Sequence, residues 1–179
     1  MLFGLFKRKQ PANSFTDKTY GNMEAKKRAC VALASQDASV IFIAWFAETA
    51  ALFKQTFAAN QLGEDRIVEV RNLSPAVIKA RRPVFLEHFP LRQKEEALIE
   101  SWPPGNIEVF NALDEGLFQY FGGERILALM KQMGMQEDEV MEHPMISKSI
   151  RNSQDKLAKK IILEQSVHSQ REWFKKNTE

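Results

Sequence analysis

The alternation of strand-like segments with helical patterns constrains the fold of this chain more than any other feature of its sequence. Four segments are rich in β-branched and aromatic residues, as strands are: 39–46, 66–73, 83–89 and 107–113. Helical patterns lie between them. Because consecutive strands joined by helices form right-handed parallel crossovers, this order predicts a parallel, doubly wound α/β sheet.

The segment SVIFIAWF, at 39–46, contains the strongest strand signal. Its four residues from Val40 to Ile43 are all apolar, as expected for a strand that helices cover on both faces. Helical patterns precede it at 22–34 and follow it at 47–60. Cys30 lies on the first of these patterns, where we expect it to be a small core residue.

The pattern becomes purely helical after Asp114. Two short helices are expected, followed by one long helix that begins near Pro144 and ends near Lys176. The spacing of four, seven and four residues places the helix's apolar side chains on one stripe, formed by Ile146, Ile150, Leu157 and Ile161.

A helix of roughly thirty residues is about 45 Å long, which exceeds the width of a sheet of four or five strands. The sequence therefore predicts that its C-terminal end projects from the domain. We expect that end to bind a second chain through Val167, Trp173 and Phe174, either another copy or a different protein.

These patterns divide the chain of 179 residues into three parts. They are a tail at 1–18, an α/β domain at 19–120 and a helical extension at 121–179. Residues 2–9 are apolar and then basic, which is the reverse of the order in a secretory signal. This segment is either a frayed tip or a peripheral membrane anchor.

Charge and cysteine content exclude several classes of function. The chain has 25 basic and 23 acidic side chains, so nothing favours binding to nucleic acid. The single cysteine excludes an internal disulfide and a cysteine-rich zinc site, and it fits a reducing cytoplasm. Three scattered histidines do not predict a metal site.

The segment at 117–157, LFQYFGGERILALMKQMGMQEDEVMEHPMISKSIRNSQDKL, resembles SecA, the bacterial preprotein translocase motor. SecA has a similar Phe–Gly–x–x–Arg segment, Gly–Met pair, acidic loop, His–Pro step and helix entrance after its second nucleotide-binding domain. The resemblance implies that 19–120 is a RecA-like domain of that type. It also implies that the long helix corresponds to the start of the helical scaffold of SecA.

Elements that a SecA motor needs are missing from this sequence. It contains no Walker A sequence to hold phosphates, no Walker B pair for magnesium and no arginine-finger segment; Arg92 is the nearest basic residue. We therefore expect no ATPase activity and no cofactor, and binding of ATP with magnesium is disfavoured.

Two small groups of residues are candidates for chemistry or for nucleotide binding. Glu87 and His88 end the strand at 83–89, where they either do general acid–base work or simply face solvent. Arg81, Arg82 and Arg92 form either an anion pocket or a set of solvated charges.

The leading hypothesis is a SecA-like protein without motor activity that binds protein in the cytoplasm or at the inner membrane face. Its expected partners are translocase components or a second copy, bound through the C-terminal helix. One alternative is a nucleotide-binding subunit that completes an ATP site with a partner chain. Another is a small α/β enzyme that uses Glu87 and His88.

Overall fold

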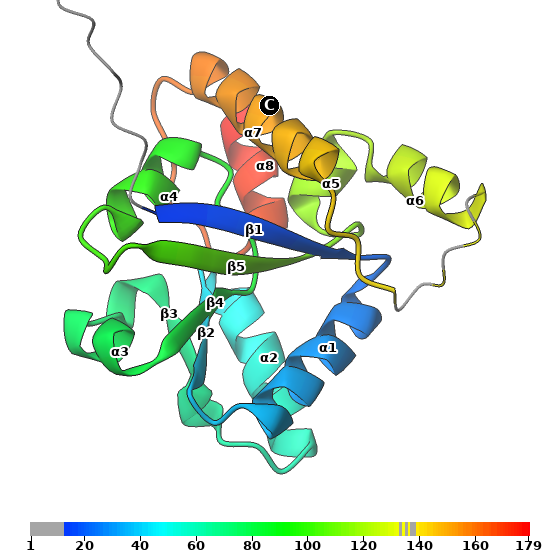
Figure 1. Ribbon diagram of the computed structural model, residues 1–179. Coiled ribbons are helices and arrows are strands. Elements are labelled where there is room, and N and C mark those ends of the chain that lie inside the picture. The colour runs from blue at the N-terminus through cyan, green and yellow to red at the C-terminus, as the bar shows by residue number, and fades with distance from the viewer. Residues whose placement is uncertain (1–12, 133, 135, 137–138) are drawn as a thin grey trace, which may run out of the picture.

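The computed structural model describes residues 13–132, 134, 136 and 139–179, and it contains a parallel five-stranded sheet with helices on both faces (Figure 1). The spatial order is β1-β5-β4-β2-β3. This architecture confirms the predicted α/β class and is consistent with a RecA-like fold. The strands are β1 Asn13–Tyr20, β2 Val40–Ala44, β3 Ile67–Glu69, β4 Arg82–Phe85 and β5 Gly105–Ala112.

Eight α-helices and two short 3-10 helices occur in the described part of the chain. The α-helices are α1 Met23–Gln36, α2 Ala47–Ala59, α3 Pro75–Ala80, α4 Arg92–Ile99, α5 Gly116–Tyr120, α6 Gly123–Gln132, α7 Pro144–Lys160 and α8 Gln170–Thr178. The 3-10 helices are η1 Glu64–Arg66 and η2 Val70–Asn72. None of the described helices is long and apolar enough to cross a membrane.

Helices cover both faces of the inner strand β2, as the apolar run at 40–43 predicts. On one face, Phe42 packs with Phe53 and Phe57 of α2 and with Cys30 of α1, which is fully buried as expected. On the other face, Ile43 belongs to a cluster with side chains from β4, β5, α3 and α4. Successive residues of β2 therefore contribute to two separate cores.

The predicted tail at 1–18 is wrong from Asn13 onward, while residues 1–12 lie outside the described part. β1 pairs in parallel with β5 over eight residues, from Asn13 opposite Gly105 to Tyr20 opposite Ala112. β1 is an edge strand, so it needs less apolar sequence than an inner strand does. Its polar sequence, NSFTDKTY, therefore lacks the continuous apolar run by which the other strands were recognised.

Two other predicted strands are shorter than expected. The segment at 66–73 forms strand only at Ile67–Glu69, because its second half winds into a 3-10 helix. The segment at 83–89 leaves the sheet after Phe85. Its last four residues instead lie at the carboxyl end of β4, where they contribute to the site described below.

The predicted single helix from Pro144 to Lys176 is also wrong, because two helices occupy this region. α7 ends at Lys160, and α8 begins after Ser169. The Ser169 hydroxyl accepts a hydrogen bond from the Glu172 amide, and the Glu172 carboxylate accepts one from the His168 amide. This reciprocal capping pattern starts a new helix, and the chain folds back toward the sheet.

The helical extension covers the carboxyl ends of the strands rather than projecting from the domain. Trp173 is only 1% exposed, and Phe174, Ile150 and Leu157 are buried in the same cluster. The remaining side chains that were predicted to meet a partner are partly buried against that cluster; they are Ile146, Ile161 and Val167. The predicted free apolar stripe and the exposed aromatic end are therefore not features of this fold.

Candidate functional site

The carboxyl edge of the sheet is where open α/β folds bind ligands, and here α8 lies across it. The amide of the Gln170 side chain donates to the His88 carbonyl at 2.8 Å, and its oxygen accepts from the Leu117 amide at 2.8 Å. The Trp173 ring packs against Phe89, with centroids 6.1 Å apart. The first helical residues after β5 and the residues after β4 are thus tied to the C-terminal helix.

Glu87 lies beside the N-terminus of α2, and helix N-termini hold anions in many α/β proteins. Its carboxylate accepts hydrogen bonds from the amides of Trp45 and Phe46, each at 3.2 Å, and from the Thr49 hydroxyl at 2.7 Å. Burial raises the pKa of Glu87 to about 7, although the charge of Lys26 acts in the opposite direction. A carboxyl group of the chain itself therefore fills this anion position.

A buried ion pair lies beside Glu87. The Lys26 ammonium is fully buried and donates to the Glu115 carboxylate and to the Leu86 carbonyl. Burial raises the pKa of Glu115, while Lys26 lowers it. Both charges are compensated inside the protein, so the pair contributes to the packing of α1 against the ends of β4 and β5.

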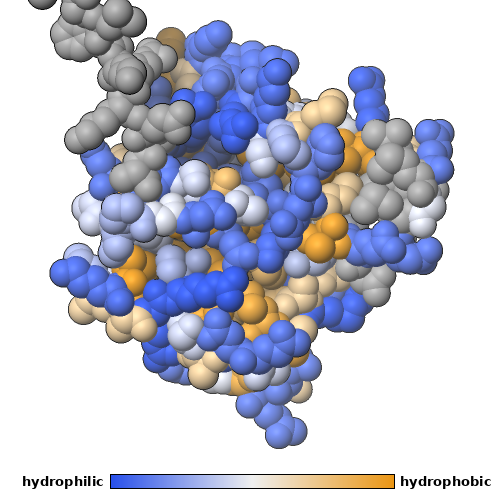
Figure 2. Space-filling view, in the orientation of Figure 1, coloured by the Kyte–Doolittle hydropathy of each residue, from blue (hydrophilic) through white to orange (hydrophobic). Residues whose placement is uncertain are grey.

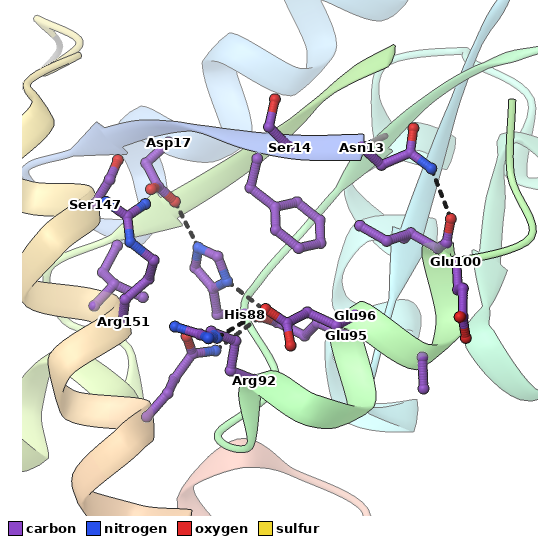
Figure 3. Close-up of a pocket in the computed structure, with 15 residues that line it drawn as sticks. Asn13, Ser14, Asp17, His88, Arg92, Glu95, Glu96, Glu100, Ser147 and Arg151 are labelled. Atoms are coloured by element: carbon purple, nitrogen blue, oxygen red, sulfur yellow. Dashed lines mark hydrogen bonds and ion pairs between the residues drawn. The ribbon is translucent and has the colours of Figure 1, made fainter. Parts of the chain in front are cut away.

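His88 lies between two carboxylates. Its Nε2 is 2.5 Å from Oδ1 of Asp17, and its Nδ1 is 2.8 Å from Oε1 of Glu95 (Figure 3). Burial lowers the pKa of His88, but Glu95 and Asp17 outweigh that effect and raise it to about 10. The imidazole is therefore protonated at neutral pH, and both of its N–H groups are engaged.

The two carboxylates carry the network into neighbouring elements. Burial raises the pKa of Asp17, but the charge of His88 and hydrogen bonds from His88, Ser147 and Asn111 bring the pKa below its ordinary value. Glu95 also accepts from the Gln154 side chain at 2.8 Å. Because Ser147 and Gln154 belong to α7, the cluster attaches that helix to β1 and α4.

The structure does not bring Glu87 and His88 together as a catalytic pair. Each is 3% exposed, so the interpretation as a solvent-facing pair is wrong. Their side chains also contact different partners, since Glu87 binds the start of α2 and His88 binds Asp17 and Glu95. Neither has a free group aimed at the other.

The three arginines predicted as an anion pocket are separated as well. Arg81 donates to the Ala38 carbonyl, and Arg82 pairs with carboxylates near the start of β4. Arg92 lies beyond the opposite end of that strand, where it pairs with Glu96 at 2.9 Å and Asp155 at 3.6 Å. No shared pocket for the three side chains results.

A cavity of about 770 Å³ lies between β1, α4 and α7. Phe15, Ile99 and Ile150 supply apolar parts of its lining. Figure 3 shows Arg151 beside Asp17 and Ser147 at one end, with Glu100 near Asn13 at the other. Among the described residues neither Arg151 nor Glu100 has an ion-pair partner, so the cavity has a positive end and a negative end.

The outer edge of β1 borders this cavity and is only partly paired. The Thr19 amide and carbonyl bond in antiparallel fashion to Met141, at 3.0 and 2.8 Å. Because peptide groups along a strand alternate in direction, those of Phe15 and Asp17 face the same outer edge. No backbone hydrogen bond between described residues occupies them. Sequence reasoning missed this site because it had placed 13–18 in the tail.

The space-filling view shows no single large apolar patch over the side presented in Figure 2, where hydrophobic areas are separated by hydrophilic side chains. In the described part of the chain, no group of three or more His, Cys, Asp or Glu side chains is arranged to hold a metal ion.

Comparison with known proteins connects one segment of the chain with SecA. Over 54 residues it is 44% identical to the protein translocase subunit SecA of Psychrobacter cryohalolentis, which is 30% of this chain and 6% of that protein. SecA 1 of Alkaliphilus metalliredigens is 39% identical and SecA of Acinetobacter baumannii 43% identical over the same length, with the same shares. No protein-family model matches the chain. A segment of this RecA-like α/β protein is therefore SecA-like, and the chain spans only a small part of these relatives.

Proposed function

We propose that this chain is a SecA-like protein without motor activity that binds protein in connection with preprotein translocation. The similarity of a 54-residue segment to protein translocase subunits supports the connection with translocation. The separate proposal that it has no ATPase activity and needs no cofactor rests on the carboxyl edge of its sheet.

The observation that carries the proposal is that the chain's own groups fill the edge where a RecA-like domain would hold phosphate. The Glu87 carboxyl accepts the amides at the start of α2, and Gln170 and Trp173 of α8 cover the adjoining strand ends. A phosphate there would have to displace a buried carboxyl group and a packed helix. This arrangement disfavours a nucleotide and leaves binding of protein as the better-supported activity.

The cavity beside β1 suits an extended segment of a partner protein. The outward-facing peptide groups of Phe15 and Asp17, which bond to no backbone group of a described residue, offer a place for one further strand. It would run in the antiparallel sense that Met141 already has at Thr19. Arg151 would then meet an acidic side chain near the start of that segment, and Glu100 a basic one near its end. This replaces the C-terminal helix as the proposed contact with translocase components.

Titration calorimetry with ATP and magnesium tests the absence of a nucleotide site. We expect no binding heat, because the described residues offer no free anion site at the carboxyl edge. Micromolar binding to the isolated chain would overturn this part of the proposal. It would favour the alternative of a nucleotide-binding subunit that is completed by a partner.

Site-specific photo-crosslinking in the native host tests the protein-binding surface. A photoreactive residue at the exposed position Ser14 of β1 should crosslink to translocase components, whereas one at the exposed position Ala58 of α2 should not. Arg151→Glu should reduce the crosslink from Ser14. Equal crosslinking from both positions, or no translocase component at all, would contradict the proposal.

A further inference from the structure

The loop between α7 and α8 carries two adjacent aliphatic side chains in full contact with solvent. Ile162 is 100% exposed and Leu163 is 84% exposed. The residues on either side of them behave differently, since Ile161 packs partly against the helical cluster and the Glu164 side chain is held by Lys94 and Trp173. The loop is therefore anchored at both ends and presents the two aliphatic side chains at its tip.

Three lysines lie on the last turns of α7, directly before this aliphatic pair in the sequence. Lys156, Lys159 and Lys160 are exposed, and with Tyr120 and Leu157 they line a shallow hollow of about 270 Å³. In the described part of the chain none of the three lysines takes part in an ion pair. The surface thus combines uncompensated positive charge, exposed aliphatic groups and a half-exposed tyrosine.

The acidic residues nearest to these lysines in the sequence are engaged elsewhere and do not cancel this charge. Glu164 follows the aliphatic pair, but its carboxylate binds Lys94 and the Trp173 indole N–H. Asp155 precedes Lys156 on α7, and its carboxylate is 3.6 Å from the Arg92 guanidinium. Both carboxylates therefore interact with side chains of α4 or α8 and not with the three lysines.

We infer that this surface binds a bilayer that contains anionic phospholipid. Ile162 and Leu163 would enter the boundary between headgroups and acyl chains, and the three lysines would face lipid phosphates. Tyr120 has the amphipathic ring that is common at the level of the headgroups. A protein partner fits less well, because two aliphatic side chains are far less than the roughly 800 Å² that each partner buries in a standard interface.

This inference is independent of the protein-binding proposal and names a different surface from the segment at 2–9. The aliphatic pair lies between α7 and α8, whereas the cavity beside β1 is lined by the first part of α7 and by α4. A substitution at the tip should therefore change lipid binding without changing the crosslink from Ser14.

Vesicle co-sedimentation with the full chain tests the inference. The protein should bind vesicles of phosphatidylcholine that contain about one third phosphatidylglycerol, and not phosphatidylcholine alone, since the lysines need an anionic surface. Ile162→Asp with Leu163→Asp should weaken binding by at least about tenfold, because each aliphatic side chain contributes about that factor on burial. Lys156→Glu with Lys159→Glu and Lys160→Glu should abolish it.

Met145→Asp is the matched control, because Met145 is a 73% exposed apolar residue at the opposite end of α7. Its binding to vesicles should equal that of the unchanged chain. All these side chains are exposed, so every variant should keep a cooperative thermal melt. The melting temperature of the lysine variant should fall slightly, because carboxylates replace cations in the last turns of α7. Equal binding by the aspartate pair and the control would overturn the inference and assign the lipid contact to another segment.

A fluorescence measurement gives a direct readout of insertion. An environment-sensitive dye on Ile162→Cys should shift to the blue with anionic vesicles, and the same dye on Met145→Cys should not. Cys30 is fully buried and stays unlabelled in the folded protein. If there is no shift, or if light scattering shows instead that the aliphatic pair holds two copies together, the lipid surface is refuted.

Discussion

The carboxyl edge of the sheet and the outer edge of β1 lie close to each other around His88, but they differ in whether their polar side chains have partners within the chain. At the carboxyl edge, Glu87, Lys26 and Gln170 are buried and each is fully engaged within the chain. Beside β1, Arg151 and Glu100 line an open cavity without an ion-pair partner among the described residues. The comparison teaches that a concentration of polar side chains does not by itself mark a binding site. The presence of unpaired groups next to open space does.

The largest expected loss of stability comes from a substitution in the helix that covers the carboxyl edge. Trp173→Ala removes a ring that is almost completely buried against Phe89, so it should lower the free energy of unfolding by about 3–5 kcal/mol. Chemical denaturation followed by circular dichroism measures this change. Met145→Ala, at an exposed position of α7, serves as the control and should change the unfolding free energy by less than about 0.5 kcal/mol. Equal stability of the two variants would mean that α8 does not cover the sheet in solution.

The next effect concerns the charge cluster that joins the two regions. The pKa of His88 is raised in the folded state to about 10 from an ordinary value of 6.5. Its contribution to stability is therefore complete below pH 6.5 and is lost as the pH rises toward 10. We expect the free energy of unfolding to fall by up to about 3 kcal/mol between pH 7 and pH 10.

Denaturation curves across this pH range would measure the loss. His88→Gln, if it folds, should start from a lower stability at pH 7 and should show a flatter pH dependence. A slope that is the same in both proteins would show that another group is responsible.

A smaller change in stability is expected at Glu87. Its pH dependence tests whether the Glu87 carboxyl group is held beside the N-terminus of α2, as the structure shows, or leaves that position free for another anion. Its pKa is raised to about 7, so its favourable contribution is present below the ordinary value of 4.5 and declines as the pH rises through 7. Glu87→Gln should therefore gain about 1–3 kcal/mol relative to the unchanged chain between pH 4.5 and pH 8. Paired unfolding measurements at these two pH values test it. If the difference in unfolding free energy between the two proteins is the same at both pH values, the pKa of Glu87 does not change on folding.

The smallest change in stability is expected in the cavity beside β1. Arg151→Ala and Glu100→Ala remove exposed charges that hold no partner among the described residues, so each should change the unfolding free energy by less than about 0.5 kcal/mol. Thermal melts of both variants give this value. A loss of 2 kcal/mol or more, roughly the scale of a buried network, would show that these side chains are structural.

The sequence was most informative where one segment is buried on both faces. SVIFIAWF predicted β2 because its apolar run has only one explanation in a chain with this alternation of elements. β1 was missed because its sequence contains Asp17 and Lys18, whose charges are compensated by His88 and Glu108 only once the chain has folded. The break before α8 could have been recognised, since Ser169 followed by Glu172 is a capping pattern. The prediction instead continued one helix through these residues to Lys176, although its apolar stripe ended at Ile161.

The charge cluster could not be predicted from the residues that form it. His88 is 71 positions from Asp17 and 66 positions from Gln154, and only the fold brings their elements together. Position at the end of a predicted strand did locate Glu87 and His88 at the carboxyl edge. Their opposite orientations depend on the turn that follows Phe85, which no local pattern determines.

The placement of α8 has a consequence for the kinetics of folding. Trp173 completes a cluster with Phe46, Phe89 and Leu113, which follow the ends of β2, β4 and β5 in the chain. These contacts join residues that are far apart in the sequence, so the entropy of loop closure opposes them and slows their formation. We therefore expect the docking of α8 to be one of the slow steps of folding, and the carboxyl edge of the sheet to stay open to solvent until it occurs.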